Sequence, residues 1–256
     1  IIMGYLPLNK YLINDKNNCD KSILLFPYAG GGSNIYKDWT SAFQNFDVIR
    51  ILYPGRESRF SESPVTNLKK LTNDNYEEML ESFNFNNPYY LFGHSMGTKV
   101  VYELTLRIQN NNQLPNPKGI IISAGRAPCF MEPKPIYHLD ETGFIEGLKG
   151  YGGTPVEVLE NKELMTLFLP MLRADFIIDE KYQNLNQKQL ESPILALMGT
   201  KDEQMELYEL LEWENYTTKS FKYEYIEGGH MFINNNAEEA IVKIKEFIND
   251  LQKVHH

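Results

Sequence analysis

Short apolar runs alternate with longer helical patterns along most of the chain. Four- to seven-residue apolar runs predict strands at 22–26, 47–53, 89–92, 119–123, 193–198 and 221–226. Helical periodicity predicts helices at 35–46, 68–83, 96–109, 205–214 and 237–251. Several strand runs are apolar on both faces, as in a sheet that helices cover on both sides. The pattern therefore predicts an α/β fold with a mostly parallel central sheet.

The segment 128–191 interrupts this alternation, because its more than sixty residues far exceed an ordinary connection. It contains helical patterns at 141–149 and 162–182 and a glycine pair, Gly152-Gly153. Ligands bind at the carboxyl edge of parallel sheets, so we interpret the segment as a lid over that edge. The alternative is an ordinary extra helical layer. Arg173 and Asp175 are expected to form an ion pair that braces the insertion.

Composition narrows the class of protein. The 256 residues, 42% of them hydrophobic, suit one domain over 1–256. With 25 basic and 34 acidic residues the net charge is −9, which argues against a nucleic-acid or anionic membrane partner. No run suits a membrane span or a signal peptide. Cys19 and Cys129 are expected to be reduced thiols of a soluble cytoplasmic protein, monomeric by default. His255 and His256 are interpreted as a tag remnant.

One motif predicts a catalytic serine. The sequence Gly93-His94-Ser95-Met96-Gly97 matches G-x-S-x-G, follows a predicted strand directly and opens a predicted helix. That context is what a nucleophile elbow requires, whereas a serine in an incidental glycine-rich turn is the alternative. Ser95 is the predicted nucleophile. The backbone N–H of Met96 lies at the helix start, where it would stabilise an oxyanion.

A serine nucleophile needs a base and an acid that orients the base. His230 follows the last predicted strand and precedes the last helix, where a base is expected. The other histidines outside the terminal pair lie in the elbow and in the insertion, at His94 and His138. Asp202 follows the strand at 193–198 and is the predicted acid, with Glu203 as its local competitor. The chain order Ser95, Asp202, His230 is that of the α/β-hydrolases.

A glycine-rich loop at 27–33 follows the first predicted strand. It lacks the Lys-Ser/Thr ending of a P-loop and the G-x-G-x-x-G spacing of dinucleotide-binding proteins. In a hydrolase such a loop supplies a second backbone N–H opposite the elbow. We expect that donor to be the N–H of Tyr28 or of Ala29. No cluster of residues has the spacing of metal ligands.

Five motifs in order resemble one family over nearly the whole chain. They are Phe26-Pro27-x-Ala29-Gly30-Gly31, Pro54-Gly55-Arg56-Glu57-Ser58-Arg59, Gly93-His94-Ser95-Met96-Gly97, Gly152-Gly153-Thr154-Pro155 and Gly228-Gly229-His230. Together they resemble the type II thioesterases that accompany nonribosomal peptide and polyketide synthases. Thr98-Lys99 departs from the pattern, because a small residue or glycine is frequent after the elbow.

The resemblance implies hydrolysis of acyl groups from the phosphopantetheine thiol of an acyl or peptidyl carrier protein, which clears stalled or mis-primed chains. In it Ser95 is the acylated nucleophile, His230 the general base and Asp202 the orienting acid, with no cofactor. A medium-chain fatty acyl-carrier-protein thioesterase or a general carboxylesterase would share the fold. A protein that docks a synthase without catalysis is the alternative from another class.

The arginines of the second motif allow two interpretations. By analogy, Arg56 or Arg59 would contact the carrier's phosphate or acidic surface. The structural interpretation, which we favour, pairs them with nearby acids such as Glu57 or Glu62.

Overall fold

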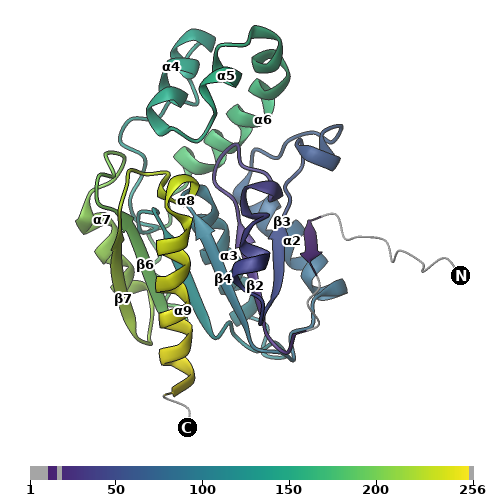
Figure 1. Ribbon diagram of the computed structural model, residues 1–256, viewed down its shortest axis with the longest axis vertical. Coiled ribbons are helices and arrows are strands. Elements are labelled where there is room, and N and C mark those ends of the chain that lie inside the picture. Colours follow the sequence, from purple (N-terminus) through teal and green to yellow (C-terminus); the bar gives the residue numbers. More distant parts are fainter. Residues whose placement is uncertain (1–10, 16–18, 254–256) are drawn as a thin grey trace, which may run out of the picture.

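A seven-stranded sheet forms the centre of the molecule (Figure 1). The computed structural model describes residues 11–15 and 19–253; the signal-peptide and tag interpretations lie outside them. The strand order is β1-β3-β2-β4-β5-β6-β7, and only β1 runs antiparallel, against β3. The strands are β1 (Leu12–Asp15), β2 (Ser22–Phe26), β3 (Asp47–Ile51), β4 (Tyr89–His94), β5 (Gly119–Ser123), β6 (Ile194–Gly199) and β7 (Phe221–Ile226). The predicted mostly parallel sheet is confirmed.

Helices cover both faces of the sheet. Leu24 and Phe26 of β2 pack with α2 (Leu68–Ser82) and α3 (Met96–Gln109) in one apolar cluster. The alternate residues of β2 pack on the other face with α9 (Ala237–Lys253), which Figure 1 shows crossing the front of the sheet. This two-sided burial accounts for strands that are apolar at every position.

The prediction of a long helix at 35–46 is wrong. A 3₁₀ turn, η1 (Ser33–Tyr36), and one short helix, α1 (Trp39–Ala42), occupy this segment. The tyrosine hydroxyl at the end of η1 donates to the carbonyl of Phe26, and Trp39 packs on Phe92 of β4. These contacts bring the aromatic side chains onto the sheet, which a continuous helix would not do.

Shorter elements complete the fold. They are η2 (Glu57–Arg59), α7 (Leu207–Leu211), η3 (Glu212–Tyr216) and α8 (Phe232–Asn235). The predicted helix at 205–214 is therefore divided between α7 and η3. Strand β1 was not predicted because its sequence, Leu-Ile-Asn-Asp, is short and half polar.

The insertion forms helices α4 (Glu141–Tyr151), α5 (Val156–Leu159) and α6 (Lys162–Lys181), which lie together above the sheet in Figure 1. They have an apolar cluster of their own, with Phe144, Leu148 and Phe176 buried in it. Leu148 and Phe176 also line a cavity with Ser95, so the insertion covers the carboxyl end of β4. That it opens and closes as a lid stays a prediction.

Candidate active site

Ser95 lies in a sharp turn between β4 and α3. Its backbone has φ 51° and ψ −116°, a conformation that is unusual for any residue except glycine. The turn needs small neighbours, because a Cβ atom on Gly93 would lie 2.4 Å from the carbonyl oxygen of Gly97. A Cβ on Gly97 would lie 2.4 Å from the carbonyl oxygen of Phe26. The two glycines therefore let β4, α3 and the end of β2 meet beneath the serine.

The structure brings Ser95, His230 and Asp202 into one hydrogen-bonded chain. The Nε2 atom of His230 lies 3.0 Å from the Oγ of Ser95. Its Nδ1 lies 2.9 and 3.2 Å from the two carboxylate oxygens of Asp202. The Asp202 side chain is fully buried, and one of its oxygens also accepts the backbone N–H of Gln204. In this geometry the carboxylate orients the imidazole, and the imidazole can accept the serine proton.

Two loops hold the acid and the base together. The loop after β6 and the loop after β7 join through a hydrogen bond from Lys201 N to the carbonyl of Gly228. Gly228 has φ +127°, a conformation that favours glycine. Gly199 approaches the second loop so closely that a Cβ there would lie 2.5 Å from the carbonyl oxygen of Gly229. The glycines thus place Asp202 beside His230.

His94 supports the backbone of His230. It is fully buried, and its Nε2 lies 3.0 Å from the carbonyl oxygen of His230. A carbonyl only accepts, so this nitrogen must carry the proton, and Nδ1 then accepts from the hydroxyl of Ser123 at 2.8 Å. Burial holds the pKa of His94 well below its usual value. The elbow histidine is thus a neutral support and does not contact Ser95 as a base.

The glycine-rich loop lies beside the elbow, and Tyr28 and Ala29 line a cavity with Ser95. The next two amides already have acceptors within the protein. Gly30 N donates to a carboxylate oxygen of Asp175 at 2.7 Å, and Gly31 N donates to the carbonyl of Tyr28 at 2.9 Å. The loop's candidates for a second oxyanion donor therefore stay the N–H groups of Tyr28 and Ala29, alongside that of Met96. These assignments stay predictions.

Two small cavities flank Ser95, with volumes of about 10 and 20 Å³. Each has room for about one water molecule. The larger has charged residues in its wall, which sequence reasoning did not assign to the site. These are Lys99, which pairs with Asp179 of α6, and Arg126, which pairs with Glu132. Lys99 is the residue that departs from the family pattern, and that departure was the only sequence signal.

Another acid of the insertion has a perturbed pKa. Burial raises the pKa of Glu180 to about 7, although its carboxylate accepts the backbone N–H groups of Ile136 and Tyr137. Tyr151, which lines both cavities, lies 3.4 Å from this carboxylate, and burial raises the pKa of its hydroxyl well above the usual value.

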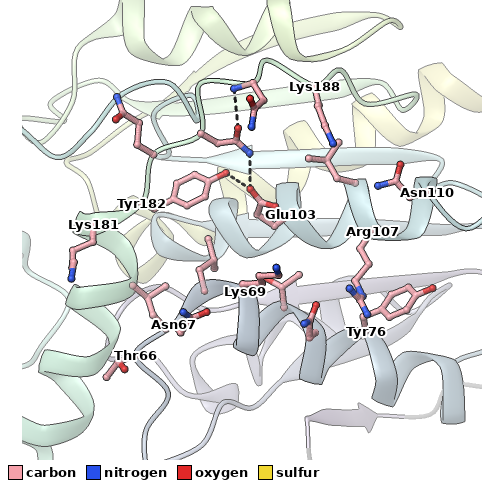
Figure 2. Close-up of a pocket in the computed structure, with 18 of the residues that line it drawn as sticks. Thr66, Asn67, Lys69, Tyr76, Glu103, Arg107, Asn110, Lys181, Tyr182 and Lys188 are labelled. Carbon is pink, nitrogen blue, oxygen red and sulfur yellow. Dashed lines mark hydrogen bonds between the residues drawn. The ribbon is translucent and has the colours of Figure 1, made fainter.

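A much larger groove, of about 850 Å³, lies away from the serine between α2, α3 and the residues after α6. Figure 2 shows Glu103 near its centre, where its carboxylate accepts hydrogen bonds from the hydroxyl of Tyr182 and the side-chain amide of Asn184. None of Ser95, Asp202 and His230 lines this groove, so its size does not mark the centre of the predicted chemistry.

The arginine predictions are corrected in part. Arg59 pairs with Glu62 at 2.6 Å, as the structural interpretation predicted. Arg56 does not pair with Glu57; it forms a buried ion pair with Asp175 at 2.5 Å. The predicted pair between Arg173 and Asp175 is therefore wrong. The guanidinium of residue 173 instead donates to the backbone carbonyls of Tyr137 and Leu139.

Several class expectations can be compared with the described residues. Cys19 and Cys129 are free thiols, as expected. Within 11–15 and 19–253, no group of three or more His, Cys, Asp and Glu residues could hold a metal ion. No helix in this part of the chain has the length and apolar character needed to cross a bilayer.

A Ser–His–Asp chain above a mostly parallel sheet with helices on both faces defines the α/β-hydrolase class. Within that class, the thioesterase domain family matches residues 21–248, and this chain belongs to it. The chain is 34% identical over 238 residues to GrsT, a gramicidin S biosynthesis protein of Aneurinibacillus migulanus. That match covers 91% of this chain and 92% of GrsT.

Two further comparisons bear on the family. The chain is 32% identical over 244 residues to LgrE of Brevibacillus parabrevis, named linear gramicidin dehydrogenase, with 93% of this chain and 92% of LgrE covered. Among solved structures it is similar to YbtT, a type II thioesterase from the yersiniabactin NRPS/PKS pathway. There the TM-score is 0.84 at 27% identity, and 95% of this chain and 98% of that chain are covered.

Proposed function

We propose that this protein hydrolyses acyl thioesters on the phosphopantetheine arm of acyl or peptidyl carrier proteins, and so clears stalled or mis-primed acyl chains from a synthase. The observation that carries the proposal is the hydrogen-bonded chain Ser95–His230–Asp202 within a thioesterase-family domain. The names of GrsT and YbtT, which belong to peptide and mixed synthase pathways, support the carrier-protein substrate.

In the proposed acylation, His230 Nε2 takes the proton of Ser95 as the serine oxygen attacks the thioester carbonyl. The carbonyl oxygen becomes an oxyanion that accepts the N–H of Met96 and that of Tyr28 or Ala29. When the tetrahedral intermediate collapses, the carbon–sulfur bond breaks and the thiol leaves with the proton from the imidazole. The charge of Asp202 stabilises the imidazolium that exists between these two proton transfers.

Deacylation reverses the roles. Water replaces the thiol, the imidazole of His230 accepts its proton, and attack on the acyl-serine forms a second tetrahedral intermediate. Its collapse releases the carboxylic acid and returns the proton to the Ser95 oxygen. The side chains on this path supply every proton transfer, so the proposed reaction needs neither metal nor cofactor.

Substrate entry requires a change at the insertion. The cavities beside Ser95 have room for little more than water, whereas an acyl group on a pantetheine arm is far larger. Leu148 and Tyr151 of α4 form part of the wall, and we propose that this part of the insertion moves aside as a lid when the arm enters.

The name of LgrE suggests a reductive alternative, which would require a nicotinamide cofactor. The glycine-rich loop 27–33 lacks the G-x-G-x-x-G spacing of dinucleotide-binding loops, and its amides contact Asp175 and its own turn. A general carboxylesterase is the nearer competitor, because the same catalytic residues cleave oxygen esters.

The test is release of free thiol from an acyl-phosphopantetheinyl carrier protein, measured beside an oxygen ester with the same short acyl group. We expect turnover on the carrier-bound thioester and loss of that turnover in Ser95→Ala. Activity confined to the oxygen ester would assign the protein to the general esterases instead. Folded protein with no activity on either substrate would favour the docking role.

A further inference from the structure

A buried carboxylate of the insertion contacts the loop that we assign to the oxyanion. Asp175 of α6 is only 1% exposed. Its Oδ2 accepts both the N–H of Gly30 at 2.7 Å and Nη1 of Arg56 at 2.5 Å. Its Oδ1 accepts Nη2 of the same guanidinium at 2.8 Å. The pair is thus bidentate, which fixes the relative orientation of its two partners.

Arg56 contacts the same loop from the other side. The guanidinium is buried, and its Nη1 also donates to the carbonyl oxygen of Gly31 at 3.1 Å. Its remaining donors bond the carbonyl of Pro54 in its own turn. The two side chains therefore bind an N–H and a carbonyl of adjacent loop residues, directly after the proposed donors Tyr28 and Ala29.

Packing restricts the loop further. Gly30 has φ +82°, and a Cβ atom there would lie 2.5 Å from Cδ2 of Leu172, one turn before Asp175 on α6. Beyond the glycines, the carboxylate of Glu57 accepts the hydroxyl of Ser33 at 2.5 Å and the backbone N–H of Asn34 at 3.0 Å. The segment after β3 and helix α6 therefore hold the loop from two directions.

We propose that Arg56 and Asp175 are positioning residues for the reaction, which set the place of the oxyanion N–H groups of Tyr28 or Ala29 relative to Ser95. The proposal rests on the proposed function of that loop. A buried ion pair often adds little net stability over apolar residues of similar size, whereas an oxyanion donor must be placed accurately to be effective. Geometry is therefore what the pair contributes here.

This assignment divides the insertion by role. Helix α6 carries Asp175 and Leu172, which both contact the loop, so α6 belongs to the catalytic framework. Any opening that admits substrate is then confined to α4 and α5, while α6 stays in place. A shift of α6 would displace the loop and weaken oxyanion stabilisation.

The test compares Asp175→Asn and Arg56→Lys with the matched control Arg59→Lys. Arg59 is a buried arginine of the same turn, but it pairs with Glu62 and donates to the carbonyl of Leu52. The readouts are kcat and KM for thioester hydrolysis and the rate at which a fluorophosphonate probe labels Ser95 by intact mass. The probe forms a tetrahedral adduct at an activated serine, whatever acyl substrate the protein uses.

We expect kcat and the labelling rate to fall about 10- to 100-fold in both clamp variants, with KM nearly unchanged. The pH dependence of labelling should keep its midpoint, because His230 and Asp202 are untouched. Arg59→Lys should label like the unaltered chain. Thermal unfolding identifies variants that are folded at the assay temperature, and Arg56→Lys, which keeps a cation beside Asp175, is the milder change.

Wild-type labelling rates in folded Arg56→Lys, or losses in both clamp variants no larger than in Arg59→Lys, would overturn the proposal. An altered pH midpoint would also overturn it, because the effect would then act through the base. If the unaltered chain is labelled at Ser95 yet hydrolyses no thioester, the proposed function fails while the labelling comparison still decides the role of the clamp.

Discussion

At the scale of single residues, the site depends on contacts between segments that are far apart in the chain. Ser95, Asp202 and His230 come from loops after three different strands, and each is held by close glycine packing or by a backbone hydrogen bond. His94 adds a buried, neutral support to the base. Rigid placement of this kind keeps the groups ready before substrate arrives.

The buried acid should affect the rate much more than its exposed neighbour. We expect Asp202→Asn to lower kcat by about 10³- to 10⁴-fold, because an amide stabilises the imidazolium poorly and favours the wrong tautomer. Glu203→Gln is the control, since Asp202 already occupies both contacts to His230 Nδ1. Steady-state thiol release measures both variants. An equal loss in the two, or a loss confined to Glu203→Gln, would contradict the assignment of the acid.

Chain position was enough to predict the serine, the acid and the base as candidates, because each follows a strand. It was not enough for the ion pairs. Arg173 and Asp175 are two residues apart on one helix and so cannot face each other, a constraint that the predicted pair ignored. The true partner of Asp175 is 119 residues away, and only the folded chain brings Arg56 to it.

At the scale of elements, the strands and long helices were predictable from periodicity. The ends of β5, β7 and α3 agree with the predicted ranges. The failure at 35–46 has a physical cause, since the aromatic residues there follow the surface of the sheet and not a helical face. Short α5 and α8 were missed because four residues carry little periodicity.

The elbow requires glycine at 97, where β2, β4 and α3 meet. In Gly97→Ala the new Cβ would meet backbone oxygens of Phe26 and Pro27 at 2.4 and 3.0 Å, and backbone cannot yield cheaply. We expect a loss of about 1–3 kcal/mol in unfolding free energy together with loss of activity. Gly150→Ala of α4 is the control, because a Cβ there meets nothing within 4 Å. Urea unfolding checks both, and a neutral Gly97→Ala would contradict the packing described.

Helix α6 should carry a pH-dependent part of the stability through Glu180. Its folded pKa of about 7 lies above the model value of 4.5, so the folded state binds this proton more tightly than the unfolded state. The stabilisation is complete below about pH 4.5 and is lost as pH rises to about 7. Glu180→Gln should therefore lose less unfolding free energy than the unaltered chain between pH 5 and 8. Exposed Glu146→Gln is the control, and equal pH dependence in all three would contradict the assignment.

At the scale of the whole molecule, the parallel sheet collects the functional loops at one edge. Strands β2, β4, β6 and β7 lie in one sheet, and the loops after them carry the glycine loop, the serine, the acid and the base. The insertion covers this edge and adds Asp175 and Lys99's partner Asp179. Sequence order predicted the edge, whereas the contacts of the insertion depended on how α6 packs on the body.

The most direct test follows the mass of an acetyl-phosphopantetheinyl carrier protein mixed with the unaltered chain or with Ser95→Ala. We predict that the unaltered chain converts the carrier to its free-thiol form over many turnovers, while the carrier stays acetylated with folded Ser95→Ala. Equal conversion by both proteins would show that Ser95 is not the nucleophile. An acetylated carrier that persists with the unaltered chain, while an oxygen ester is cleaved, would contradict the thioesterase account.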